Sequence, residues 1–256
     1  MENNDSFVAH PHDEARGRVA CQVGFWVAVA TSFATILTFA LAITAVPNSG
    51  RNCRNDCVAY PFTDETVAEQ FPGDYLWMFP AMVVTVLFVA LVACLHESAA
   101  AGRKVFSLVS LCLAVIAAAV LLVDYFVQVT VMKPSLEKGQ LEGLALVTQY
   151  NPNGVFIALE ELGYLLMSVA FVVVAPVLPT TTRVERALRW LLVAGFAATI
   201  VALGVVTGVY GFDRQDSFEV PVISIVWLVL VTAGPLLAVV FRRVSFADVP
   251  TAGGAA

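Results

Sequence analysis

The sequence predicts an all-helical, polytopic integral membrane protein: a six-transmembrane-helix bundle with both termini cytoplasmic. Of its 256 residues, 59% are hydrophobic and only 13% are charged. A water-soluble domain of this size cannot bury so much apolar surface, so lipid must be the solvent for most of it. Six stretches reach the roughly 20 apolar residues that are needed to cross a bilayer core.

The six predicted spans are separated by polar connections. They cover residues 19–46, 75–95, 105–132, 154–178, 188–210 and 220–241. Together they form a transmembrane domain over 19–243, preceded by a polar cytoplasmic tail (1–18) and followed by a disordered cytoplasmic tail of small residues (244–256). The first tail lacks the small-residue cleavage site of a signal peptide, so we expect it to be retained.

The distribution of Arg and Lys predicts the orientation. With this topology nine of these residues lie on the side of the termini and five on the other side. An excess of basic residues marks the cytoplasmic side, and we expect the protein in the cell membrane. The nine are Arg16, Arg18, Arg103, Lys104, Arg183, Arg186, Arg189, Arg242 and Arg243, and the five are Arg51, Arg54, Lys133, Lys138 and Arg214.

The first outer loop, residues 47–74, holds two of the five cysteines. Cys53 and Cys57 lie among Asn, Gly, Asp and Pro residues that favour an irregular loop, and they can form a small ring in an oxidising environment. We expect a disulfide between them. A metal pair or a redox dithiol is the alternative, but the loop offers no further Cys or His ligand. The other cysteines, Cys21, Cys94 and Cys112, fall in apolar runs and are expected to be small core residues.

Two other features have more than one interpretation. Gly204 and Gly208 have the GxxxG spacing that lets helix backbones approach closely in lipid, and we expect it to pack spans within the chain, with a homodimer as the alternative. Between the third and fourth spans, helical spacing recurs over Leu141, Leu144, Ala145 and Thr148. They predict a short surface helix, either a lid over a polar site or a plain surface helix.

The third and fourth spans carry acidic residues where charge is costly. Asp124 lies eight residues before Met132, the outer end of one span, and Glu160 lies six residues after Gly154, the outer start of the next. At a rise of about 1.5 Å per residue, the two positions lie roughly 12 and 9 Å below the outer surface. We therefore expect them at a common level.

Further polar and aromatic side chains fall near this level and complete the predicted site. Glu160 and Glu161 are about 100° apart around their helix, so only one of them can face the site. No Lys or Arg lies in the apolar cores of the spans. Either some carboxyl groups are protonated, or a cation from outside completes the site. The predicted site residues are Asp124, Tyr125, Gln128, Glu160, Glu161, Tyr164 and Trp227.

We interpret these residues as an outward-facing intramembrane carboxylate site that binds or transports a proton or a cationic or amphipathic small molecule. The carboxylates would take the charge, and the aromatic rings would contact the apolar part. One alternative is an intramembrane enzyme that acts on a lipid or isoprenoid with a carboxyl general acid. Others are an accessory membrane subunit and a hydrogen-bonded clamp between two spans that binds no ligand.

The remaining sequence features narrow the range of partners and cofactors that the protein could bind. There is no basic run for nucleic acid, no phosphate-binding glycine loop and no HExxH, GxSxG or CxxC motif. Two of the three histidines lie in the polar N-terminal tail, which excludes haem held by histidine pairs within the membrane. We expect no cofactor and no metal. Membrane lipid and a small-molecule ligand are the expected partners, with a homo-oligomer or a membrane partner left open.

Overall fold

The computed structural model describes residues 11–44, 49–51, 53–54, 57–60 and 73–247. Within these residues the chain is helical and contains no strand. Six helical stretches are long and apolar enough to cross a membrane. This confirms the predicted all-helical class and agrees with the number of predicted spans. The stretches are Val19–Thr44, Gly73–Glu97, Ala101–Glu137, Val155–Val177, Arg183–Tyr210 and Gln215–Arg243.

Six long helices build the bundle, and short helical turns extend or connect them. The long helices are α1 (Pro11–Thr44), α3 (Met78–Glu97), α4 (Lys104–Val127), α7 (Val155–Val174), α8 (Arg183–Tyr210) and α9 (Glu219–Ala247). The short elements are η1 (Gly73–Tyr75), η2 (Ala101–Arg103), the π-helical η3 (Gln128–Met132), α5 (Lys133–Glu137), α6 (Leu144–Val147), η4 (Ala175–Val177) and η5 (Gln215–Ser217).

The first and last helices are longer than the predicted spans. Helix α1 begins at Pro11, inside the predicted polar tail, because proline fits a first helical turn and the acidic residues after it favour a helix N-terminus. Helix α9 continues to Ala247, beyond the predicted end of the domain. The rest of the predicted C-terminal tail, 248–256, lies outside the described residues.

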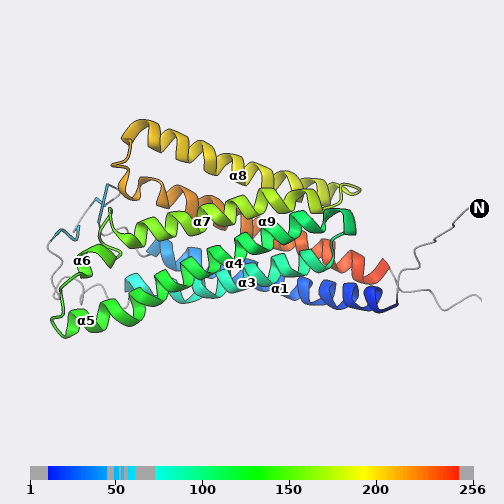
Figure 1. Cartoon of the computed structure of the whole chain (residues 1–256), viewed down its shortest axis with the longest axis horizontal. Helices are drawn as coiled ribbons and strands as arrows, with labels where there is room; N and C mark the ends of the chain where they lie inside the picture. Colours follow the sequence, from blue (N-terminus) through cyan, green and yellow to red (C-terminus); the bar gives the residue numbers. More distant parts are fainter. Residues whose placement is uncertain (1–10, 45–48, 52, 55–56, 61–72, 248–256) are drawn as a thin grey trace, which may run out of the picture.

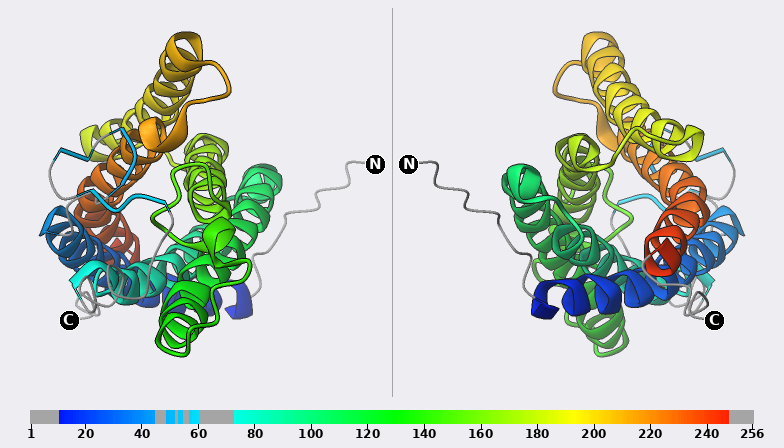
Figure 2. Two further views of the ribbon diagram at one scale, coloured as in Figure 1. Left: turned by 90° about the vertical axis from the view of Figure 1, so that its left-hand side faces the viewer. Right: turned by 90° about the vertical axis from the view of Figure 1, so that its right-hand side faces the viewer.

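The helices run roughly along one long axis and pack side by side as a bundle (Figure 1). Helix α1 contacts α3 and α9, α3 contacts α4, and α4 contacts α7, while α8 contacts α7 and α9 from the outside. The start of α1 and the end of α9 lie at the same end of the bundle. We call the opposite end, which carries α5, α6 and η5, the loop end. Viewed along the axis, α8 leans away from the other helices (Figure 2).

Close backbone approach holds α1 against α9. A Cβ atom added to Gly234 of α9 would lie 2.1 Å from Ser32 Oγ and 2.7 Å from the carbonyl oxygen of Ala28. The Ser32 hydroxyl also donates to the carbonyl of Val231 at 3.2 Å. A larger residue than glycine therefore does not fit at position 234. Helix α7 meets α4 in a similar way, where a Cβ on Gly163 would lie 2.5 Å from Leu121.

The glycine pair of α8 does not pack spans within the chain, so that prediction is wrong. A Cβ on Gly204 or Gly208 would meet no atom of the described residues within 4 Å. The reason is that α8 lies at the edge of the bundle and turns this face outward. The glycine that lets α8 approach α9 is Gly195, where an added Cβ would lie 2.6 Å from Val229.

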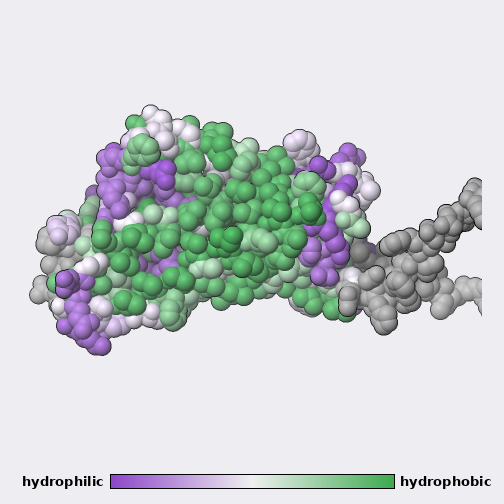
Figure 3. All heavy atoms as spheres, in the orientation of Figure 1, coloured by the Kyte–Doolittle hydropathy of each residue, from purple (hydrophilic) through white to green (hydrophobic). Residues whose placement is uncertain are grey.

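The outer surface of the bundle is apolar around its middle. In the view of Figure 3, apolar residues cover the centre and hydrophilic residues gather towards both ends. Large apolar side chains are strongly exposed on several spans, including Trp26 and Phe33 of α1, Phe126 of α4 and Val201 of α8. Such a belt is typical of a surface in contact with lipid tails.

The cysteines take three different environments. Cys53 and Cys57 are joined by a disulfide, with their Cα atoms 5.9 Å apart. Cys21 and Cys94 are buried, in agreement with a core role, whereas Cys112 is exposed and its predicted core role is wrong. Cys112 lies two residues, about 200° of helical rotation, from the buried Ala114, so it turns away from the face that α4 buries.

Candidate functional site

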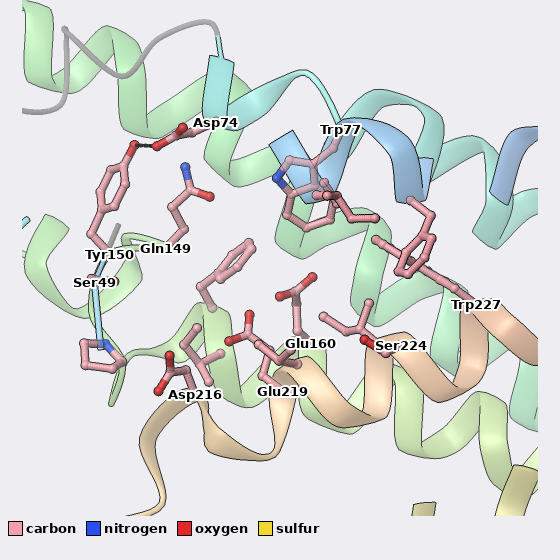
Figure 4. A pocket seen from close by; sticks show the side chains of 18 residues that line it. Ser49, Asp74, Trp77, Gln149, Tyr150, Glu160, Asp216, Glu219, Ser224 and Trp227 are labelled. Atoms are coloured by element: carbon pink, nitrogen blue, oxygen red, sulfur yellow. Dashed lines mark hydrogen bonds between the residues drawn. The ribbon is translucent and has the colours of Figure 1, made fainter. Parts of the chain in front are cut away.

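A cavity of about 410 Å³ lies near the loop end (Figure 4). Its walls come from the outer turns of α1, α7 and α9, from η1 and η5, and from the segment that precedes α7. These elements bring residues from both ends of the chain together because α1 packs against α9. The lining residues are Phe39, Ala42, Ile43, Ser49, Asp74, Trp77, Gln149, Tyr150, Pro152, Phe156, Ile157, Glu160, Asp216, Glu219, Val220, Ile223, Ser224 and Trp227.

Among the described residues, the cavity is lined by four acidic side chains and by no Lys, Arg or His. Two of the acids are tied to the wall: Asp74 accepts a hydrogen bond from the Tyr150 hydroxyl at 3.0 Å, and Asp216 accepts one from the backbone N–H of Arg51 at 3.2 Å. Burial raises the pKa of the Tyr150 phenol, so it remains a donor at neutral pH. The cavity therefore has an acidic lining of fixed geometry.

The other two acids, Glu160 and Glu219, lie beside each other and have no basic partner among the described residues. Figure 4 shows their side chains on the same wall of the cavity. Glu160 is 0% exposed, and its Oε2 atom has no hydrogen-bond partner among the described residues. Glu219 is half-buried and is the first residue of α9. An unsatisfied carboxylate oxygen at a cavity wall is costly unless a proton or a cation occupies the cavity.

A chain of hydrogen bonds runs from the bundle core to Glu160. The Tyr125 hydroxyl donates to Glu160 Oε1 at 2.5 Å, and the Tyr125 and Tyr164 hydroxyls are 2.9 Å apart. Trp227 Nε1 donates to the Tyr164 hydroxyl at 3.1 Å. Because Tyr125 gives its single proton to Glu160, Tyr164 must be the donor in the bond between the two tyrosines. All three donors thus point towards Glu160 and stabilise a negative charge on it.

Aromatic rings form the inner wall of the cavity. Trp77 packs edge-on against Tyr125 and Trp227, with ring centroids 5.3 and 6.1 Å apart. Trp227 also packs against Phe39 of α1, with centroids 5.8 Å apart. The rings hold one another in place and lie next to the acids, an arrangement that suits a ligand with both a cationic and an apolar part.

The predicted site residues differ in where they lie relative to the cavity. Glu160 and Trp227 line the cavity, and Tyr125 and Tyr164 lie behind Glu160 in the hydrogen-bond chain. Asp124 is buried behind the wall, close enough to Glu160 and Glu219 for their charges to interact, and its Oδ2 atom has no hydrogen-bond partner within the described chain.

Gln128 lies outside the cavity and has a supporting role. Its Nε2 atom donates to the carbonyl of Val147 at 2.6 Å, and its Oε1 atom accepts from the backbone N–H of Gln149 at 3.2 Å. The amide therefore fixes the segment that carries Gln149 and Tyr150 into the cavity wall. The helix α6, which is the short helix expected in this connection, ends just before that segment.

Glu161 also lies outside the cavity, because it faces the connection between α8 and α9. There it forms an ion pair with Arg214. The sequence places no basic residue in the apolar cores of the spans, so no ion pair was predicted for the acids. Arg214 supplies one from the connection, so Glu161 is not free to take the charge of a ligand.

Several cavity residues were missing from the prediction, and Glu219 is the most important. It lies one residue before the predicted span 220–241, yet it is the first residue of α9 and lines the same cavity as Glu160 (Figure 4). One signal was available: Glu219 directly precedes the predicted span 220–241, at the outer end of the bundle near which Glu160 was also expected. The other missing lining residues include Asp74, Trp77 and Asp216. They reach the cavity because of the way the connecting segments fold, which the sequence pattern does not predict.

The chain was also compared with known proteins. No family model, curated protein or solved structure matches it. Within the described residues, no three His, Cys, Asp or Glu side chains are arranged to hold a metal ion. The acids of the cavity are instead spread along its walls.

The ion pair of Glu161 gives a direct stability prediction. We expect Arg214→Gln to destabilise the protein by about 1–3 kcal/mol, because it leaves Glu161 buried without a counter-charge. The double variant Arg214→Gln/Glu161→Gln should recover most of the loss, since it removes the unpaired charge. Thermal unfolding in detergent measures both effects. Equal melting temperatures for the wild type and the single variant would contradict this role.

Proposed function

We propose that the protein is a multi-pass protein of the cell membrane and that its cavity binds, or binds and transports, an organic cation. The ligand is a small molecule with a positively charged nitrogen and an apolar body. The six apolar spans and the apolar belt support insertion into a membrane. The excess of Arg and Lys on the side of the termini supports cytoplasmic termini and an extracytoplasmic loop end.

The acidic lining, which contains no basic side chain among the residues that the structure describes, carries the proposal. Taking a carboxylate out of water is costly unless an opposite charge accompanies it, and no basic side chain of the described chain accompanies Glu160. A ligand cation provides that charge. The volume of about 410 Å³ falls within the range of about 300–1,000 Å³ that is usual for small-molecule sites.

The apolar part of the ligand would lie against the aromatic wall. Trp77, Trp227 and Phe39 offer ring surface next to the carboxyl groups, and the faces of such rings attract cations. A second cavity of about 610 Å³ lies beyond the first and shares Ser49, Tyr150 and Pro152 with it. This continuity supports access from the loop end.

The test compares three probes of one shape and different charge. Benzylammonium, benzyl alcohol and benzoate are titrated into the purified protein in lipid nanodiscs, and binding is followed by calorimetry. Only benzylammonium should bind saturably, because only it supplies the missing charge. Equal binding of all three probes, or preferred binding of benzoate, would overturn the proposal.

A further inference from the structure

Two carboxyl groups in contact, without a basic neighbour, share a proton when the cavity is empty. Glu160 and Glu219 are in this position: both line the cavity, and Figure 4 shows their carboxyl groups close together on one wall. Two adjacent carboxylates in a low-dielectric site do not both remain ionised. The empty pair therefore carries one proton and one negative charge.

The hydrogen-bond chain decides where the proton lies. Tyr125 donates to Glu160 Oε1, and Tyr164 and Trp227 continue the donor chain behind it. These donors favour the ionised form of Glu160. The proton consequently belongs to Glu219, which donates it towards Glu160.

Within the described part of the chain, the surrounding elements supply no positive charge that could replace this proton. The described titratable groups that face the pair are acidic or phenolic, and Arg214 forms its ion pair with Glu161. The wall contributed by α1 holds only apolar side chains, and Trp77 adds an indole. The facing groups are Asp124 and Tyr125 of α4, Glu161 and Tyr164 of α7, and Asp216 of η5.

We propose that the cavity exchanges one ligand cation for one proton, and that its ligands are primary or secondary ammonium ions. This inference rests on the proposed function. The ammonium donates one N–H to Glu160 Oε2 and one to Glu219, the O–H bond of Glu219 breaks, and its proton leaves to water. Before the exchange, one carboxylate and one protonated carboxyl group carry a net charge of −1. After it, two carboxylates and the bound ammonium again carry a net charge of −1. A quaternary ammonium has no N–H to donate and does not bridge the two carboxyl groups.

The number of released protons tests the exchange. Benzylammonium binding is measured by calorimetry in two buffers of different ionisation enthalpy near neutral pH. The wild type should release about one proton per bound ligand. Glu219→Gln should bind benzylammonium with almost no proton release, and Glu142→Gln, which changes an exposed loop acid at the same end, should behave as the wild type.

The outcomes separate the two proposals. Benzylammonium binding without proton release in the wild type would overturn the exchange and leave the cation site standing. Undiminished release in Glu219→Gln would also overturn it. No binding of any cation would overturn the proposed function itself. If Glu219→Gln does not fold, benzyltrimethylammonium provides the contrast on the wild type: it should bind far more weakly than benzylammonium, and equally tight binding with equal proton release would overturn the exchange.

Discussion

Glu160→Gln is expected to weaken benzylammonium binding by about 30- to 3,000-fold, because truncating one partner of a buried charge pair costs roughly 2–5 kcal/mol. Glu160 is fully buried and lies at the cavity wall. Tyr125 donates a hydrogen bond to it, and Tyr164 and Trp227 extend this chain of donors. Glutamine keeps the size of the side chain and removes its charge. Calorimetric titration of the variant measures the loss directly.

The matched control for this variant is Glu142→Gln. Glu142 is exposed in the connection between α5 and α6, so its replacement should leave the affinity unchanged. Thermal unfolding of Glu160→Gln should show a folded protein at least as stable as the wild type, because the substitution removes a buried charge. Wild-type affinity in a folded Glu160→Gln protein would contradict the assignment of Glu160 to the ligand.

Gly234→Ala is expected to destabilise the protein by about 3 kcal/mol, a cost typical of overpacking a tight contact. The added methyl group would collide with Ser32 Oγ and with the backbone oxygen of Ala28, and the backbone cannot move aside as a side chain can. The melting temperature should fall by roughly 6–12 °C. The contact between α1 and α9 also positions Phe39 and Trp227, so the variant should bind benzylammonium less tightly.

Gly204→Ala is the matched control on α8. An added Cβ there meets nothing within 4 Å among the described residues, and alanine is the better helix former. Its melting temperature should be equal to or slightly above that of the wild type. A larger loss of stability from Gly204→Ala than from Gly234→Ala would contradict the packing of α8 at the edge of the bundle.

The spans could be predicted from the sequence because their apolar length depends only on composition over about 20 residues. The ends of α1 and α9 could not, since the helices continue into polar residues after the hydropathy signal has ended. The outward face of Gly204 and Gly208 depends on where α8 lies in the bundle, which spacing alone does not specify.

Only part of the cavity lining could be predicted, because the sequence indicates the depth of a residue along a helix but not the direction in which it faces. Helix rise placed Glu160 and Trp227 near one level, and both line the cavity. Which residues turn inward depends on helix rotation, and that is set by contacts such as Gly163 with Leu121. For this reason Glu219 was missed and Glu161 was included, although Arg214 engages it from a connecting segment.

The position of a bound cation is the most direct test of the cation site. Crystals grown with 4-bromobenzylammonium would locate the bromine by its anomalous scattering. We expect a bromine peak inside the cavity against the aromatic wall of Phe39, Trp77 and Trp227, with the ammonium nitrogen within hydrogen-bond distance of Glu160. An empty cavity, with bromine found only on the lipid-facing surface of the helices, would contradict it.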